Sequence, residues 1–276
     1  MEIKDKRGEA KACAGLGTML FSLSEYQKAK EYHEKALAIC MEIKDKRGEA
    51  DACTNLGAAL HSLGEYQKAK EYYEKALAFH MEIRDQKREA GARTNLGAAL
   101  HSLGRSRRSH KPSGGVKFTG EFQKAKEYYE VALAIFMQIK NKEGEATPRS
   151  NLGAALILLG EYQKAKEYSE KALAINMEPR RKKGNAGART NPGVVFHLLG
   201  GYEKAYEYHE KALAISMETT DKVGEADART NQGKVLYLLG EFQKAKEHYE
   251  KALAIYMVTS HSEKVMQCFL GLGGNW

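Results

Sequence analysis

Apolar residues recur along the chain at the spacing of helix faces, in pairs of segments separated by a short polar break. Leu56, Leu60 and Leu63 share one face of a first helix. After the break at Gly64, a second face is formed by Tyr66, Ala69, Tyr73, Ala76, Leu77 and Phe79. Spacings of three or four residues are typical of amphipathic α-helices. The pattern therefore predicts two consecutive helices joined by a tight turn.

The predicted helix pair returns at a fixed interval. The residues Met1–Ala10 recur unchanged as Met41–Ala50. Equivalent methionines follow at intervals of 40 residues, with one interval of 56, at Met81, Met137, Met177, Met217 and Met257. A period of about 20–50 residues indicates stacked supersecondary units, each contacting mainly its neighbours. We therefore expect an all-α solenoid, a single array over residues 1–276 with about six repeats starting near 1, 41, 81, 137, 177 and 217 and a partial seventh from 257.

Turn chemistry supports these boundaries. Gly64 suits the left-handed conformation that closes a helix. The same position holds Ser24, Gly104, Gly160, Gly200 and Gly240 in other repeats. Asp45 lies just before the next helix, where a carboxylate caps free N–H groups. Equivalent caps are expected at Asp5, Asp85, Asn141 and Asp221.

The second repeat resembles the tetratricopeptide repeat signature at Leu56, Gly57, Leu60, Gly64, Tyr66, Ala69, Tyr73, Ala76 and Leu77. The resemblance implies a right-handed superhelix of antiparallel helix pairs, which cross closely at the small residues Gly57 and Ala69. The 40-residue length and the Asn55–Gly57 triplet are similar to a longer subtype. That subtype includes the Leu-Gly-Asn spindle-orientation adaptors and arrays like tetratricopeptide repeat protein 28. Cys53 and Arg93 depart from the family, since they stand where it has an early tryptophan.

The resemblance implies that one face of each first helix lines a concave groove. Its most regular residue is asparagine, at Asn55, Asn95, Asn151, Asn191 and Asn231, with Gly15 in the first repeat. A carboxamide offers both a donor and an acceptor, so it can pair with a peptide backbone without reading its sequence. In related arrays such a ladder holds extended peptides. The asparagines could instead bond within the scaffold, and Asn191 is set apart because Pro192 follows it.

Other groove positions would shape the preference for ligand side chains. These are Thr54, Thr94, His61, His101 and Tyr237. The histidines could titrate or bind metal, but Phe21 and Ile157 occupy the same position in other repeats, which favours interchangeable wall residues. The family's carboxylate clamp needs a cation four residues before the asparagine. Only Lys11 fits, in the repeat that lacks the asparagine.

The net charge of +8 is concentrated in two basic stretches. Their residues include Arg105, Arg107, Arg108, Arg180, Arg181, Lys182 and Lys183. The first stretch lies in the extra residues 105–120 of the third repeat, where we expect a disordered loop because Ser, Gly and Pro break any periodicity. Nucleic-acid or nuclear-import binding is disfavoured, because a binding face spreads its charge and interleaves aromatic residues.

Composition narrows the function classes further. No segment is apolar enough to span a bilayer or serve as a signal peptide. The scattered Cys13, Cys40, Cys53 and Cys268 indicate free thiols in a reducing compartment, the cytoplasm or the nucleus. His33–Glu34 lacks the second histidine of a zinc helix. We expect no catalytic residue, metal or cofactor.

We therefore predict a non-catalytic interaction scaffold that binds a partner peptide or helix in the groove. The subtype resemblance suggests a cytoskeletal, spindle or signalling adaptor. The chain begins and ends in mid-pattern, so an alternative is a sensor or autoinhibitory array from a larger signalling protein. Pro192 predicts a hinge around Asn191, since a mid-helix proline removes a hydrogen bond.

Overall fold

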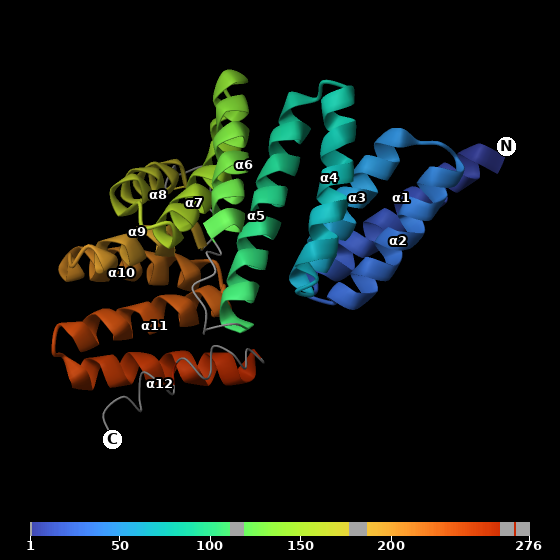
Figure 1. Cartoon of the computed structure of the whole chain (residues 1–276). Helices are drawn as coiled ribbons and strands as arrows, with labels where there is room; N and C mark the ends of the chain where they lie inside the picture. The colour runs from blue at the N-terminus through green and yellow to red at the C-terminus, as the bar shows by residue number, and fades with distance from the viewer. Residues whose placement is uncertain (1, 111–118, 177–186, 260–267, 269–276) are drawn as a thin grey trace. The chain divides into compact units, whose positions relative to one another are not determined.

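The computed structural model describes residues 2–110, 119–176, 187–259 and 268 (Figure 1). Within these residues every regular element is a helix, and there are twelve. They are α1 (Glu2–Ser22), α2 (Tyr26–Glu42), α3 (Lys46–Ser62), α4 (Tyr66–Glu82), α5 (Gln86–His110), α6 (Thr119–Gln138), α7 (Lys142–Leu158), α8 (Tyr162–Asn176), α9 (Gly187–Leu198), α10 (Tyr202–Glu218), α11 (Lys222–Leu238) and α12 (Phe242–Val258).

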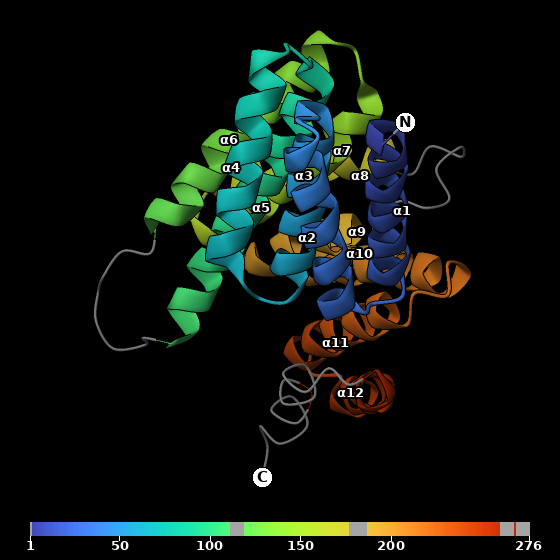
Figure 2. The ribbon, with the colours of Figure 1, turned by 90° about the vertical axis from the view of Figure 1, so that its right-hand side faces the viewer.

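The chain forms two compact units, Met1–Pro148 and Arg149–Trp276. In the first unit, α1 packs on α2, α3 on α4 and α5 on α6, as antiparallel pairs (Figures 1 and 2). The helix α3 also contacts both α1 and α5, whereas the described parts of α2 and α4 do not meet. The first helix of each repeat therefore faces inward. We call these the inner helices and their partners the outer helices.

The second unit follows the same rule. Its helices pair as α9 with α10 and α11 with α12. The inner helices α9 and α11 contact each other, whereas the described residues of α10 and α12 do not. The prediction of an all-α solenoid built from antiparallel helix pairs is confirmed.

Helix starts follow the predicted capping chemistry in most repeats. The Asp45 carboxylate accepts the N–H of Gly48 at 3.1 Å, and Asp221 accepts that of Gly224 at 2.9 Å. Asp85 and Asn141 make equivalent bonds. The expectation for Asp5 was wrong, because α1 already begins at Glu2 and Asp5 lies inside it.

The inner and outer helices of a repeat cross where glycine removes a side chain. A Cβ added to Gly57 would lie 2.6 Å from the Cε1 atom of Tyr73. Gly97 and Tyr129 repeat this geometry. The aromatic ring of the outer helix therefore rests on bare backbone, and only glycine allows this approach. The resemblance had implied a small residue at Gly57, and the ring of Tyr73 explains why.

The third repeat departs from the prediction at its turn. The helix α5 continues through Gly104 to His110, so Gly104 closes no helix and residues 105–110 are helical rather than a loop. Residues 104–110 contain no proline, and one glycine inside a helix costs only about 1 kcal/mol. An ion pair between Arg107 and Glu121 joins α5 to α6. Residues 111–118 and the side chain of Arg108 lie outside the described set.

Pro192 does not interrupt its helix. It is buried within α9, which begins at Gly187. The missing N–H would have bonded the carbonyl of Ala188, so the loss falls on the first turn alone. Asn191 lies in the same helix, but its side chain is outside the described set, as are residues 180–183 of the second basic stretch. A hinge at this point stays a prediction.

Candidate functional site

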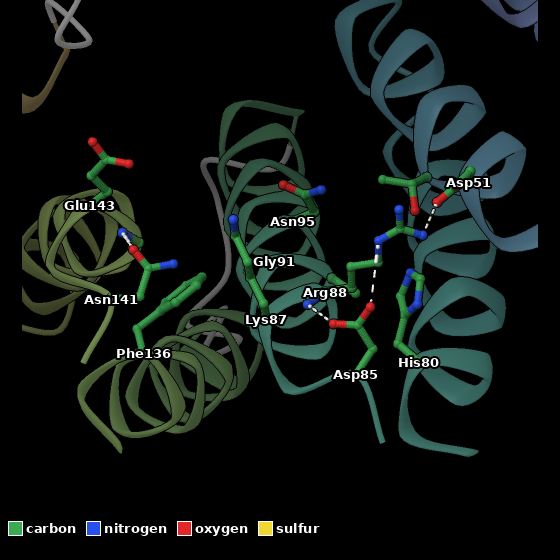
Figure 3. Close-up of a pocket in the computed structure, with 13 residues that line it drawn as sticks. Asp51, His80, Asp85, Lys87, Arg88, Gly91, Asn95, Phe136, Asn141 and Glu143 are labelled. Carbon is green, nitrogen blue, oxygen red and sulfur yellow. Dashed lines mark hydrogen bonds and ion pairs between the residues drawn. The ribbon is translucent and has the colours of Figure 1, made fainter. Parts of the chain in front are cut away.

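The inner helices of the first unit border two neighbouring cavities. The larger, about 620 Å³, lies among α3, α5 and the turn from α6 to α7 (Figure 3). The smaller, about 330 Å³, lies among α1, α2 and α3. We call them the Gly91 cavity and the Lys11 cavity after a lining residue of each. Asp51 lines both, so the two cavities are neighbours along the inner helices.

The Gly91 cavity exists because one side chain is missing. At the position of Gly91 other repeats carry Lys11, Asp51, Thr147, Gly187 and Asp227. A Cβ added to Gly91 would meet no atom within 4 Å. Ala92, Phe136 and His80 line the same cavity and are buried. The cavity is therefore open space above a packed floor, and one substitution at Gly91 would begin to fill it.

An arginine unique to this repeat holds one wall of the Gly91 cavity. Arg88 stands where the neighbouring repeats have Gly48 and Gly144. Its guanidinium donates to Asp51 at 2.8 Å and lies 3.6 Å from the Asp85 carboxylate. Figure 3 shows this network on one side of α5, with Phe136 on the other side. Arg88 thus ties α5 to α3, two inner helices of successive repeats.

His80 lies at the edge of this network and is buried. Its exposed fraction is 3% and its Nδ1 atom has no hydrogen-bond partner. Burial, followed by the positive charge of Arg88, lowers the pKa of His80. The imidazole is therefore neutral near pH 7.

The Lys11 cavity contains a second ion pair. Arg7 and Asp45 approach to 3.0 Å at its edge. Cys40 also lines the cavity, and burial raises the pKa of its thiol. A thiol held in the protonated form is a poor nucleophile. The cavity therefore offers binding groups rather than a reactive thiolate.

The predicted asparagine ladder reaches these cavities. Asn55 lines the Lys11 cavity and Asn95 lines the Gly91 cavity. Both are half-buried, and neither carboxamide has a hydrogen-bond partner among the described residues. The same holds for Asn151 and Asn231 in the second unit. Within the described part of the chain, the ladder does not bond the scaffold.

The two threonines of the predicted site differ in exposure. Thr54 lines the Gly91 cavity and its hydroxyl donates to the Ala50 carbonyl at 2.9 Å. Thr94 makes the equivalent bond to Ala90 but is only 6% exposed. Thr94 is therefore part of the packed interior, which differs from its predicted place on the groove surface.

The predicted wall residues have a structural contact that sequence reasoning missed. His61 packs edge-on against Tyr66 with ring centroids 5.2 Å apart, across the turn of its own repeat. His101 and Tyr237 make the same contact with the first aromatic residue of their outer helices, Phe122 and Phe242. An aromatic residue five positions after the wall residue was the available signal for His61 and Tyr237, whereas the insertion separates His101 from Phe122. These side chains brace the turn.

The surroundings of the histidines also bear on the titrating ladder that the sequence analysis disfavoured. His61 lies 2.9 Å from the hydroxyl of Ser102 on the next inner helix, which ties two repeats together. Burial lowers the pKa of His61 and lowers that of His101 to about 4. Both rings are neutral near pH 7. Among the described residues, no three His, Cys, Asp or Glu side chains are grouped to hold a metal.

The family of the chain follows from its sequence and this fold. A family model described as tetratricopeptide repeat matches residues 10–82, 117–178 and 186–257, which together exceed half of the chain. The chain belongs to the tetratricopeptide repeat family. No curated protein matches the sequence. In the described part of the chain, none of the helices combines the length and apolarity needed to cross a membrane.

Solved structures confirm the fold at low identity. BtubC (BKLC) from P. vanneervenii is 21% identical with a TM-score of 0.62, covering 94% of this chain and 93% of that one. A Rap protein complexed with Competence and Sporulation Factor is 16% identical, with a TM-score of 0.68 and coverages of 96% and 74%. A signal transduction ATPase with a tetratricopeptide repeat sensor from Pyrococcus horikoshii is 19% identical, with a TM-score of 0.67 and coverages of 94% and 38%.

Proposed function

We propose that the chain is a non-catalytic protein-interaction module that binds a segment of a partner protein along its inner helices. The observation that carries this proposal is the free carboxamides of Asn55 and Asn95 beside two open cavities. A half-buried amide without a partner is costly unless water or a ligand satisfies it. A peptide backbone supplies both the donor and the acceptor that each carboxamide needs.

The spacing of the inner helices suits an extended ligand. Packed helices lie about 8–10 Å apart, and an extended chain advances about 3.3 Å per residue. Asn55 on α3 and Asn95 on α5 would then contact backbone groups three residues apart. Asn151 and Asn231 offer the same chemistry on inner helices of the second unit.

The relatives support binding as the function class. The Rap structure contains Competence and Sporulation Factor, and the Pyrococcus horikoshii protein is described as carrying a repeat sensor. Within this class we favour an adaptor, as the subtype resemblance implies, located in the cytoplasm or the nucleus. A sensor array is the second candidate. The structural match covers 94% of this chain but only 38% of the sensor ATPase, so the matched part is one region of that larger protein.

The test is a paired affinity capture from cell lysate with quantitative mass spectrometry. One bait is the wild-type chain and the other carries Asn55→Ala and Asn95→Ala. A matched control carries Gln67→Ala and Gln123→Ala, which remove two exposed carboxamides from outer helices. Partners lost only with the asparagines would support the proposal. Equal capture by all three baits would contradict it.

A further inference from the structure

The carboxylates that line the two cavities are already engaged. Asp45 pairs with Arg7, and Asp51 and Asp85 share Arg88. Glu143, at the far side of the Gly91 cavity, also has an interaction partner. No lining carboxylate of either cavity is therefore left to attract a cationic ligand.

Three cations that line the same cavities are not engaged. They are Lys11 on α1, Arg47 on α3 and Lys87 on α5. All three are exposed, and none of their side chains has an ion pair or hydrogen bond to another described residue. Each of the three inner helices thus contributes one unpaired positive charge. Over both cavities the five lining cations, Arg7, Lys11, Arg47, Lys87 and Arg88, outnumber the four lining carboxylates, Asp45, Asp51, Asp85 and Glu143.

The cations and the asparagines share the same surface. Arg47 and Asn55 line the Lys11 cavity, and Lys87 and Asn95 line the Gly91 cavity. Arg47 and Lys87 hold the same repeat position on α3 and α5, whose axes lie about 8–10 Å apart if they pack as helices usually do. Lys11 lies on α1 one helical turn beyond the equivalent residue, Arg7. Carboxylates three residues apart have a spacing of about 8–10 Å on one face of a polyproline II chain, which has three residues per turn and a rise of about 3.1 Å per residue. The equivalent positions in later repeats are Glu143, Lys183 and Val223, and Lys183 lies outside the described residues.

We infer that the partner segment is an acidic peptide whose carboxylate side chains, three residues apart, pair with Lys11, Arg47 and Lys87 while Asn55 and Asn95 bond its backbone. This inference rests on the proposed function and specifies its ligand. Recognition uses internal side chains, since the cations lie on three successive helices rather than converging on one chain terminus. Binding of this kind weakens as salt screens the charges.

The test uses a synthetic peptide of sequence Glu-Ala-Thr-Glu-Ala-Thr-Glu, with fluorescein on its N-terminal amine and an amidated C-terminus, so that neither peptide terminus is charged. A second peptide has Gln in place of each Glu, and a third is the Gln peptide with a free terminal carboxylate. Binding of each fluorescein-labelled peptide to the full chain is followed by fluorescence anisotropy at low and at physiological salt. The Glu peptide is expected to bind about tenfold more tightly than the Gln peptide, because three exposed charge pairs of roughly 0.5 kcal/mol each sum to about 1.5 kcal/mol.

Matched variants separate local recognition from net charge. Replacing Lys11, Arg47 and Lys87 together with Ala should remove about tenfold or more of the Glu peptide's affinity. Replacing Lys28, Lys68 and Lys124, which are exposed on outer helices, changes the net charge equally and should leave binding nearly unchanged. Circular dichroism establishes that both variants keep their helicity.

Three results would overturn the inference. In the first, the Glu peptide fails to bind or binds no better than the Gln peptide. In the second, the two triple variants lose equal affinity for the Glu peptide. In the third, only the peptide with the free terminal carboxylate binds tightly. The Gln peptide could bind to the wild-type chain and lose that binding when Asn55→Ala and Asn95→Ala are introduced. This result would leave the proposed function intact. If the lysate capture gives the same partners with and without the two asparagines, the proposed function itself is contradicted.

Discussion

His209 predicts a specific acid sensitivity of the second unit. Its ring packs against the backbone of Gly193, where an added Cβ would lie 2.4 Å from the Cε1 atom. The side chain is 1% exposed and its Nδ1 atom has no partner. Burial lowers the pKa of His209 from 6.5 to about 4. Tyr73, Tyr129 and Tyr249 occupy the same position in other repeats.

The sign and size of the effect follow from proton linkage. The unfolded chain binds a proton on His209 below pH 6.5, whereas the folded chain resists it until about pH 4. Stability is therefore lost as the pH falls through this window, and almost none is lost at pH 7. The loss is about 2 kcal/mol at pH 5 and about 3 kcal/mol at pH 4, because each pKa unit corresponds to about 1.4 kcal/mol.

The assay compares His209→Tyr with wild type by urea denaturation followed by circular dichroism between pH 7 and pH 4. At pH 7 the two proteins should be similar, because tyrosine fits the same site in other repeats. At pH 5 the variant should be more stable by about 2 kcal/mol. The reciprocal Tyr249→His should gain acid sensitivity. Parallel stability curves for His209→Tyr and wild type would refute the reasoning.

Four further substitutions test the packing and the turns, each by the midpoint of urea unfolding. Gly97→Ala forces a methyl group against the ring of Tyr129 and should lower the free energy of unfolding by about 1–3 kcal/mol. Its control, Gly91→Ala, meets no neighbour and should raise the free energy of unfolding by about 0.5–1 kcal/mol. A stable Gly97→Ala protein would mean that the ring moves aside. Asp221→Ala removes a helix cap and should cost about 1 kcal/mol. Thr220 has φ +55°, so Thr220→Gly should gain about 1 kcal/mol, and a loss would show that its side chain contributes more than the strain.

The helices could be predicted because each repeat gives independent evidence for the same boundaries. The expected break at Gly64 is real, with a φ of +79°, and Asp45 caps α3, the helix that precedes this break. The predicted turn at Gly104 was wrong, because it was inferred from the equivalent glycines of other repeats although the residues that follow Gly104 are different. After Gly64 the chain turns at once, whereas six residues without a breaker follow Gly104 and extend the helix. A repeat pattern predicts a turn only where the following residues also allow one.

The candidate site could be predicted only in part. The exposed face of the inner helices was found through the asparagines, since their regular spacing is visible in the sequence. The Gly91 cavity was not found, because a missing side chain makes a cavity only if no neighbouring side chain fills the space. The tie from Arg88 to Asp51 joins residues of two repeats and depends on rotamers. Such contacts follow from three-dimensional packing, which no periodicity encodes.

Repeat-to-repeat variation now separates scaffold from site on physical grounds. Gly57 and Gly97 are fixed, because any Cβ would collide with Tyr73 or Tyr129. The position of Gly91 changes freely between Lys, Asp, Thr and Gly, because its Cβ direction is empty and the helix does not depend on it. A position that varies without a packing constraint can set ligand preference at no cost in stability. The position of Gly91 is of this kind, whereas Gly48 and Gly144, which also line the cavities, leave no room for a Cβ.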